Sequence, residues 1–160
     1  MKTFNTNTKN NDEWLTPPEI INSLGEFDVD PCTPINRPWD TALIHYNKND
    51  DGFTKEWHGR VWCNPPYGRE TFEWIHKLAA HGNGMTLIFA RTETLGFHYE
   101  VWDKADAIFF FKGRLKFHYV DGKQGLSANA PSCLVAYGQN NVEAIKNANL
   151  NGKLIILKGE

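Results

Sequence analysis

Two consecutive prolines directly after an apolar segment constrain this chain more than any other feature of its sequence. Residues Arg60 to Cys63 are apolar, aromatic and β-branched in the pattern of a short buried strand, and Gly59 precedes them. Pro65 and Pro66 lack the N–H groups that a strand needs, so the strand must end here. Each proline also restricts the residue before it to extended geometry. The sequence therefore predicts a rigid loop at the carboxyl end of a strand.

This loop, Asn64-Pro65-Pro66-Tyr67, offers hydrogen-bond acceptors and almost no donors. Asn64 adds a side-chain carbonyl, and Tyr67 adds an aromatic face. A suitable ligand donates two hydrogen bonds from one nitrogen and presents a flat ring for stacking, as the amino group of a nucleobase does. Two other interpretations stay open. The loop could be a plain structural turn, or a sorting or docking peptide, although such peptides lie in polar tails.

The tetrapeptide resembles the signature of amino-group methyltransferases that use S-adenosylmethionine. Together with Asp51-Gly52-Phe53, residues 60–67 are similar to small phage-encoded DNA N6-adenine methyltransferases, and the likeness extends in patches from Asp12 to Tyr137. It implies a Rossmann-like class I methyltransferase fold with a mostly parallel sheet, one late antiparallel strand and helices on both faces. It also implies a bacteriophage or restriction–modification setting.

Alternating strand and helix patterns independently predict an α/β fold. Strands are expected near residues 27–32, 41–46, 60–63, 85–90, 107–111, 133–137 and 154–158, the last at a sheet edge. Helices are expected after Thr16 and at residues 69–81, 94–102 and 141–149. Residues 122–131 are expected to form a long flexible loop, suited to a lid or a DNA contact.

Length and composition predict one domain over residues 13–160, after a polar and poorly ordered segment at 1–12, and the resemblance implies that this is a methyltransferase domain. The sequence shows no apolar run long enough for a membrane span and no signal-peptide core, so we expect a cytoplasmic protein without a membrane partner. The cysteines and histidines lack metal-ligand spacing, and we expect no metal and no disulfide. The cysteines are interpreted as small buried hydrophobic residues.

The resemblance implies that S-adenosylmethionine is the cofactor. The segment with Trp14, Thr16 and Pro17 is similar to the one that holds the methionine end of the cofactor in relatives. The same residues also predict a plain helix start, with Thr16 as N-cap, Pro17 at the first helical position and Glu19 three residues after the cap.

Two further segments are implied in cofactor binding. Asp30-Pro31-Cys32 follows the first strand, where relatives carry Asp-Pro and then a Gly-x-Gly loop, but these glycines are missing here. Asp30 is expected to contact the cofactor, and the alternative is a carboxylate that only shapes the turn. Asp51 is expected to accept a hydrogen bond from the cofactor's adenine amine, unless it is a solvated acid in a turn-rich loop.

Double-stranded DNA is the implied partner. Because the net charge is −2, contact with DNA requires a local basic patch. Arg91 and Thr92 follow an apolar strand, in the position where open α/β sheets bind ligands. Arg114 and Lys116 lie in a Gly-Arg-Leu-Lys-Phe block that the family also shows. The plain alternatives are a solvated charged face and an ion pair between Arg91 and a nearby acid.

The implied reaction is methyl transfer to the N6 amino group of adenine in DNA. Acceptors at Asn64 Oδ1 and the Pro65 carbonyl would hold both amine N–H groups, draw the nitrogen toward tetrahedral geometry and stabilise its developing positive charge. Tyr67 would stack on a base rotated out of the duplex. The alternatives are a catalytically inactive nucleic-acid-binding module of the same fold, favoured by the missing glycines, and a methyltransferase that acts on RNA or protein glutamine.

Overall fold

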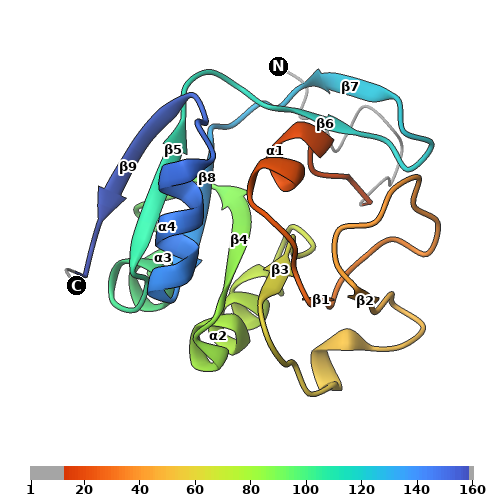
Figure 1. Ribbon diagram of the computed structural model, residues 1–160, viewed down its shortest axis with the longest axis horizontal. Coiled ribbons are helices and arrows are strands. Elements are labelled where there is room, and N and C mark those ends of the chain that lie inside the picture. The colour runs from red at the N-terminus through yellow and green to blue at the C-terminus, as the bar shows by residue number, and fades with distance from the viewer. Residues whose placement is uncertain (1–12, 159–160) are drawn as a thin grey trace.

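A computed structural model of the chain describes residues 13–158. The N-terminal segment 1–12, for which poor order is expected, lies outside the described residues. Within them a seven-stranded sheet dominates the fold (Figure 1). Its strands lie in the spatial order β2 (Ile44–His45), β1 (Val29–Asp30), β3 (Val61–Cys63), β4 (Gly84–Phe89), β8 (Ser132–Tyr137), β5 (Ala107–Phe111) and β9 (Gly152–Ile156).

Strand direction changes along the sheet. The pairings among β2, β1, β3 and β4 are parallel, whereas β8 is antiparallel to both of its neighbours, β4 and β5. Strand β5 therefore runs in the same direction as β4. The edge strand β9 is antiparallel to β5. The late antiparallel strand expected from the sequence is thus present as β8, but β9 is a second one.

Helices cover both faces of the sheet. The side chains of β8 alternate between two hydrophobic clusters, as the period of a strand requires: Leu134 belongs to one cluster, Cys133 and Val135 to the other. The first cluster also contains residues of α1 (Pro18–Ser23) and α4 (Gln139–Asn147), and the second contains residues of α2 (Thr71–His81), α3 (Leu95–Phe97) and the following π-helix (His98–Trp102). All positions of β4 and β8 are buried, which explains their continuous apolar sequences.

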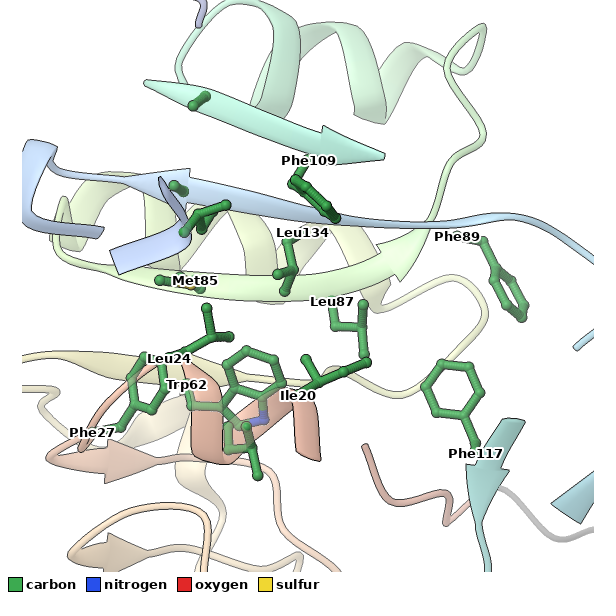
Figure 2. Close-up of a cluster of buried hydrophobic side chains, with 14 of the residues drawn as sticks. Ile20, Leu24, Phe27, Trp62, Met85, Leu87, Phe89, Phe109, Phe117 and Leu134 are labelled. Atoms are coloured by element: carbon green, nitrogen blue, oxygen red, sulfur yellow. The ribbon is translucent and has the colours of Figure 1, made fainter. Parts of the chain in front are cut away.

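A two-stranded hairpin lies apart from the large sheet. It consists of β6 (Lys116–His118) and β7 (Gln124–Ser127), which pair antiparallel. Figure 1 shows both strands across the top of the view, beside α1. Phe117 of β6 and Phe89 at the end of β4 belong to the same hydrophobic cluster, and Figure 2 shows both rings at its right-hand side. The expectation of a flexible loop over residues 122–131 is therefore wrong for its first half, because β7 occupies residues 124–127.

The start of α1 also differs from the expectation. The helix begins at Pro18, its N-cap is Pro17, and no side chain caps it. The prediction that Thr16 is the N-cap is wrong, because the Thr16 hydroxyl is hydrogen-bonded to the side chain of Asn64 instead. By contrast, α2 ends as predicted at Gly82, which has a φ of 81°. Among residues 13–158, no helix is both long enough and apolar enough to cross a bilayer.

The buried hydroxyl of Thr86 in β4 yields a stability prediction. Within the described part of the chain, Thr86 Oγ1 has no hydrogen-bond partner, and the residue is completely buried. Replacing Thr86 by Val removes an unsatisfied polar group and keeps the side-chain shape. We expect the free energy of unfolding in urea to rise by about 1 kcal/mol.

Thr41→Val is the matched control, because the Thr41 hydroxyl donates to the buried carboxylate of Asp30. That variant loses a charge-assisted hydrogen bond, so its free energy of unfolding should fall. A Thr86→Val variant that is less stable than the wild type would contradict the assignment of an unsatisfied hydroxyl.

Candidate active site

A cavity of about 280 Å³ lies at the carboxyl ends of the parallel strands. Its walls come from the loops after three strands: residues 31–34 after β1, residues 47–52 after β2, and residues 64–67 after β3. Strand β1 has β2 on one side and β3 on the other, so the chain order reverses at β1. Open α/β sheets bind ligands at such a switch point. The volume is close to the lower end of the usual range for ligand pockets, which begins at about 300 Å³.

The Asn64 side chain is held in one orientation at this wall. Its Nδ2 group donates to the main-chain carbonyl of Trp14 at 3.3 Å and to Thr16 Oγ1 at 3.4 Å. A main-chain carbonyl can only accept hydrogen bonds, so the amide nitrogen must face Trp14. Oδ1 then points the other way, and it is buried without a hydrogen-bond partner within residues 13–158. The site thus contains a desolvated acceptor that lacks a donor.

The main-chain carbonyls of the loop are not equally available. The Asn64 carbonyl accepts from the Cys32 thiol at 3.2 Å, and the Pro66 carbonyl accepts from the Thr71 hydroxyl at 2.6 Å. In the described part of the chain, no hydrogen bond reaches the Pro65 carbonyl. Within residues 13–158, Asn64 Oδ1 and the Pro65 carbonyl are therefore the acceptors of residues 64–66 that no donor occupies.

Tyr67 belongs to this wall, whereas Arg91, directly after β4, does not line the cavity. The Tyr67 ring lines the cavity and stacks on Phe89, with the ring centroids 4.7 Å apart and the planes at 22°. Burial raises the pKa of the Tyr67 hydroxyl above its usual range. The Arg91 guanidinium lies over the same Phe89 ring at 5.5 Å. Arg91 forms no ion pair among residues 13–158, so the expected alternative of a nearby acid is not realised there.

Asp30 lies beside the cavity rather than in its wall. Its carboxylate accepts hydrogen bonds from the Cys32 N–H at 3.2 Å and from the Thr41 hydroxyl, which shapes the turn after β1. Burial raises the pKa of Asp30 to about 6, although both hydrogen bonds act in the opposite direction. Asp30 lines a smaller adjoining cavity, and Pro31 lines the main one, whereas Cys32 and Asn64 line both.

The Cys32 thiol contacts a second thiol at the floor of the site. Its Sγ lies 3.9 Å from Sγ of Cys63, the residue before Asn64, and both cysteines are free. The contact with Cys63 and burial raise the pKa of Cys32 well above its usual range. The Cys32 thiol is therefore packed as a neutral group. Cys63 and Cys133 are buried, as the interpretation of the cysteines as small buried hydrophobic residues requires, whereas Cys32 is only partly buried.

Asp51 and Gly52 bring the loop after β2 against the loop after β1. Asp51 lines the cavity and adopts a left-handed conformation with a φ of 56°. A Cβ atom at Gly52 would lie 1.9 Å from the carbonyl oxygen of Pro31, so only glycine permits this approach. The Trp57 indole N–H also donates to the Gly52 carbonyl at 2.9 Å. This close approach fixes one wall of the cavity.

Several residues that line the cavity were not singled out from the sequence. They are Glu13, Thr33, Pro34, Asn47, Lys48, Gly52, Glu70 and Trp74. A signal was present for two of them, because Glu70 and Trp74 lie four residues apart around the start of α2, directly after the tetrapeptide. Among the described residues, the lining contains one basic side chain, Lys48, and three acidic ones, Glu13, Asp51 and Glu70.

The other site residues predicted from the sequence do not line the cavity. Thr92 accepts a hydrogen bond from the Trp102 indole through its main-chain carbonyl at 3.1 Å. Arg114 donates to the Ala128 carbonyl at 3.3 Å, and Lys116 is exposed on β6. Pro17 is the N-cap of α1 and adjoins Thr16. In residues 13–158, no group of His, Cys, Asp and Glu side chains could hold a metal ion.

The fold and the cavity define an α/β protein with a cavity at the carboxyl edge of its sheet, beside a loop of hydrogen-bond acceptors. The family model described as DNA N-6-adenine-methyltransferase (Dam) matches residues 3–156. The chain therefore belongs to the Dam family, and the resemblance found in its sequence is confirmed. The searches of curated proteins and of solved structures returned no match. Membership implies DNA adenine N6-methyltransferase activity in general, with S-adenosylmethionine as methyl donor and DNA as substrate.

The raised pKa of Asp30 predicts a pH dependence of stability. Its folded-state value of about 6 exceeds the ordinary value of 3.8, so folding favours the protonated carboxyl. This contribution is fully present below pH 4 and is lost as the pH rises through 6, by about 3 kcal/mol at most. Asp30→Asn carries no charge, and its side-chain carbonyl still accepts from Cys32.

We therefore expect the stability difference, variant minus wild type, to grow between pH 4 and pH 7. Urea unfolding of both proteins at these two pH values measures it. If the unfolding free energies of wild type and Asp30→Asn changed in parallel with pH, the pKa of Asp30 would be the same in the folded and unfolded states. That result would contradict this expectation.

Proposed function

We propose that this chain transfers a methyl group from S-adenosylmethionine to the N6 amino group of an adenine that is rotated out of double-stranded DNA. The observation that carries the proposal is the buried Asn64 Oδ1, which has no partner in the described part of the chain; Asn64 and Pro65 both line the cavity. A buried acceptor without a donor is costly unless a ligand satisfies it. An exocyclic amine brings the two donors that this pair lacks.

The two acceptors act on the nitrogen during the reaction. In adenine the amino lone pair is delocalised into the ring, so the nitrogen is flat and weakly nucleophilic. Hydrogen bonds from both N–H groups to Asn64 Oδ1 and to the Pro65 carbonyl favour a tetrahedral nitrogen. They also stabilise the positive charge that develops on it, and are therefore stronger in the transition state than in the ground state. Asn64 does not act as a base, because the charged product loses its proton readily.

The composition of the cavity supports a cationic cofactor. S-adenosylmethionine carries a sulfonium and an ammonium group and, when bound, supplies an activated methyl group. Glu13, Asp51 and Glu70 give the cavity wall an excess of negative charge, and Trp14 and Trp74 add aromatic surface. These residues, with Pro31 and Cys32, would hold the cofactor. The chain lacks the Gly-x-Gly loop of relatives after β1. Here Gly52 lets the loop after β2 lie close to the Pro31 carbonyl, and this contact forms the cavity wall without that loop. Asp30 would shape this wall from outside the main cavity, through its hydrogen bonds to the turn after β1.

The topology also supports the class I methyltransferase assignment. Strand β8 lies antiparallel between β4 and β5, which run in the same direction, and the cavity lies at the switch point beside β1. Tyr67 would stack on the extrahelical adenine from its position next to Asn64. Arg91 beside Phe89, together with Thr92, Arg114 and Lys116, would contact the phosphates, which carry most of the affinity for DNA.

The direct test of the proposal is transfer of labelled methyl groups to duplex DNA, followed by nucleoside analysis. We expect the label in N6-methyladenine. Matched reactions contain RNA or a protein with accessible glutamines in place of DNA. If only RNA or only the protein became labelled, that acceptor would be the substrate in place of DNA. If the chain bound DNA without any methyl transfer, it would be a catalytically inactive module.

Asn64→Ala tests the assigned acceptor. We expect methyl transfer to fall by about a hundredfold or more, because the transition state loses an oriented acceptor in a desolvated site. The affinity for S-adenosylmethionine, measured by calorimetry, should stay within about twofold of wild type. Wild-type turnover in this variant would end the catalytic assignment of Asn64.

Tyr67 is tested by a pair of variants. Tyr67→Phe keeps the ring and should retain capture of an extrahelical base, whereas Tyr67→Ala should weaken it by about 1–3 kcal/mol. The fluorescence of 2-aminopurine at the target position reports the capture. Equal fluorescence with wild type and Tyr67→Ala would exclude stacking.

A further inference from the structure

A three-residue strap, Trp14-Leu15-Thr16, lies between the loop of residues 64–67 and the β6–β7 hairpin. On one side it accepts both hydrogen bonds of the Asn64 amide nitrogen, through the Trp14 carbonyl and Thr16 Oγ1. On the other side Leu15 pairs with His118 of β6: the Leu15 N–H donates to the His118 carbonyl at 2.8 Å, and the His118 N–H donates to the Leu15 carbonyl at 3.0 Å. The strap is thus fixed from both sides.

The environment of Thr16 suits a positioning role better than a ligand contact. Its side chain is almost completely buried, with 3% exposure, and does not line the main cavity. It lines the smaller cavity of about 20 Å³, which it shares with Asp30 and Asn64. That volume is close to one water molecule and far below that of an amino acid. The Thr16 hydroxyl does reach the Asn64 side chain.

The geometry points to Thr16 as a positioning residue, which locks the Asn64 amide so that Oδ1 faces the target amine. This inference rests on the proposed function of Asn64 and replaces the expected contact between Thr16 and the cofactor. The amide has one fixed acceptor, the Trp14 carbonyl, and could still turn about that contact. A second acceptor on a different atom removes this freedom, because both N–H groups are then held.

Matched variants separate a positioning role from a cofactor contact. Thr16→Val removes the hydroxyl and keeps the shape, and Thr16→Ser keeps the hydroxyl. We expect Thr16→Val to lower kcat for methyl transfer about three- to tenfold, the effect of one hydrogen bond. Its Kd for S-adenosylmethionine, measured by calorimetry, should stay within about twofold of wild type. Thr16→Ser should recover kcat to within about twofold.

Thr86→Val is the control for removal of a buried threonine hydroxyl, because Thr86 Oγ1 has no partner within residues 13–158. Its kcat should equal that of the wild type. A Thr16→Val variant whose Kd for S-adenosylmethionine rises by the factor lost in kcat/KM would overturn the inference and restore Thr16 as a cofactor residue. Wild-type kcat and Kd in Thr16→Val would also overturn it.

The orientation of the amide can be observed without any reaction. The side-chain NH₂ resonances of Asn64 in ¹⁵N-labelled protein are identified by their loss in Asn64→Ala. Thr16→Val should shift or broaden these resonances, and Thr16→Ser should leave them near the wild-type position. Unchanged resonances in Thr16→Val would exclude the contact.

A double-mutant comparison completes the test. In the Asn64→Ala background, Thr16→Val should change the residual rate less than twofold, because the group that it positions is gone. A full additional loss would assign Thr16 a separate role and overturn the inference. Failure of the proposed function is a different result: Asn64→Ala then keeps wild-type turnover, whatever Thr16→Val does.

Discussion

The orientation of one side-chain amide governs the candidate site. Asn64 follows a strand that two prolines terminate, and its Nδ2 group is hydrogen-bonded to a segment about fifty residues earlier in the chain. The carbonyl of Trp14 accepts and never donates, so the amide nitrogen faces this segment, and the second bond, to Thr16 Oγ1, leaves the amide one stable orientation. Oδ1 then remains as a buried acceptor. Without these bonds the amide could turn its N–H groups toward the cavity, and an incoming amine would meet a donor.

Contacts with neighbouring residues reduce the number of loop carbonyls that can bind a ligand. A proline corner exposes several carbonyls, and any of them could compete for a donor on the ligand. The Cys32 thiol occupies the Asn64 carbonyl, and the Thr71 hydroxyl occupies the Pro66 carbonyl. Among residues 64–66, the Pro65 carbonyl is the main-chain acceptor that no described donor occupies, in addition to the amide oxygen. These residues thereby present two acceptors, which matches the two N–H groups of an exocyclic amine.

Local patterns predicted the regular elements well and failed where long-range contacts decide. The apolar runs of β4 and β8 and the glycine after α2 were sufficient for those elements. Strand β7 was missed because Gln124 to Ser127 contains no apolar pattern and pairs only with β6. Thr16 was assigned to a helix cap on local spacing, yet its hydroxyl is hydrogen-bonded to Asn64. For Thr16, a partner 48 residues away outweighed the local preference, whereas the partner of β7 is the preceding strand of the same hairpin.

The sequence by itself determined the end of the strand at Asn64, the donor-poor character of the loop and membership of the Dam family, because these depend on residue types and their order. The tertiary structure alone decided which acceptors remain unoccupied, which residues line the cavity, and that Thr16 faces Asn64 while Asp30 stays behind the wall. The physical reason is that a hydrogen bond depends on a partner within about 3 Å. In this chain those partners come from separate strand ends that meet only at the edge of the folded sheet.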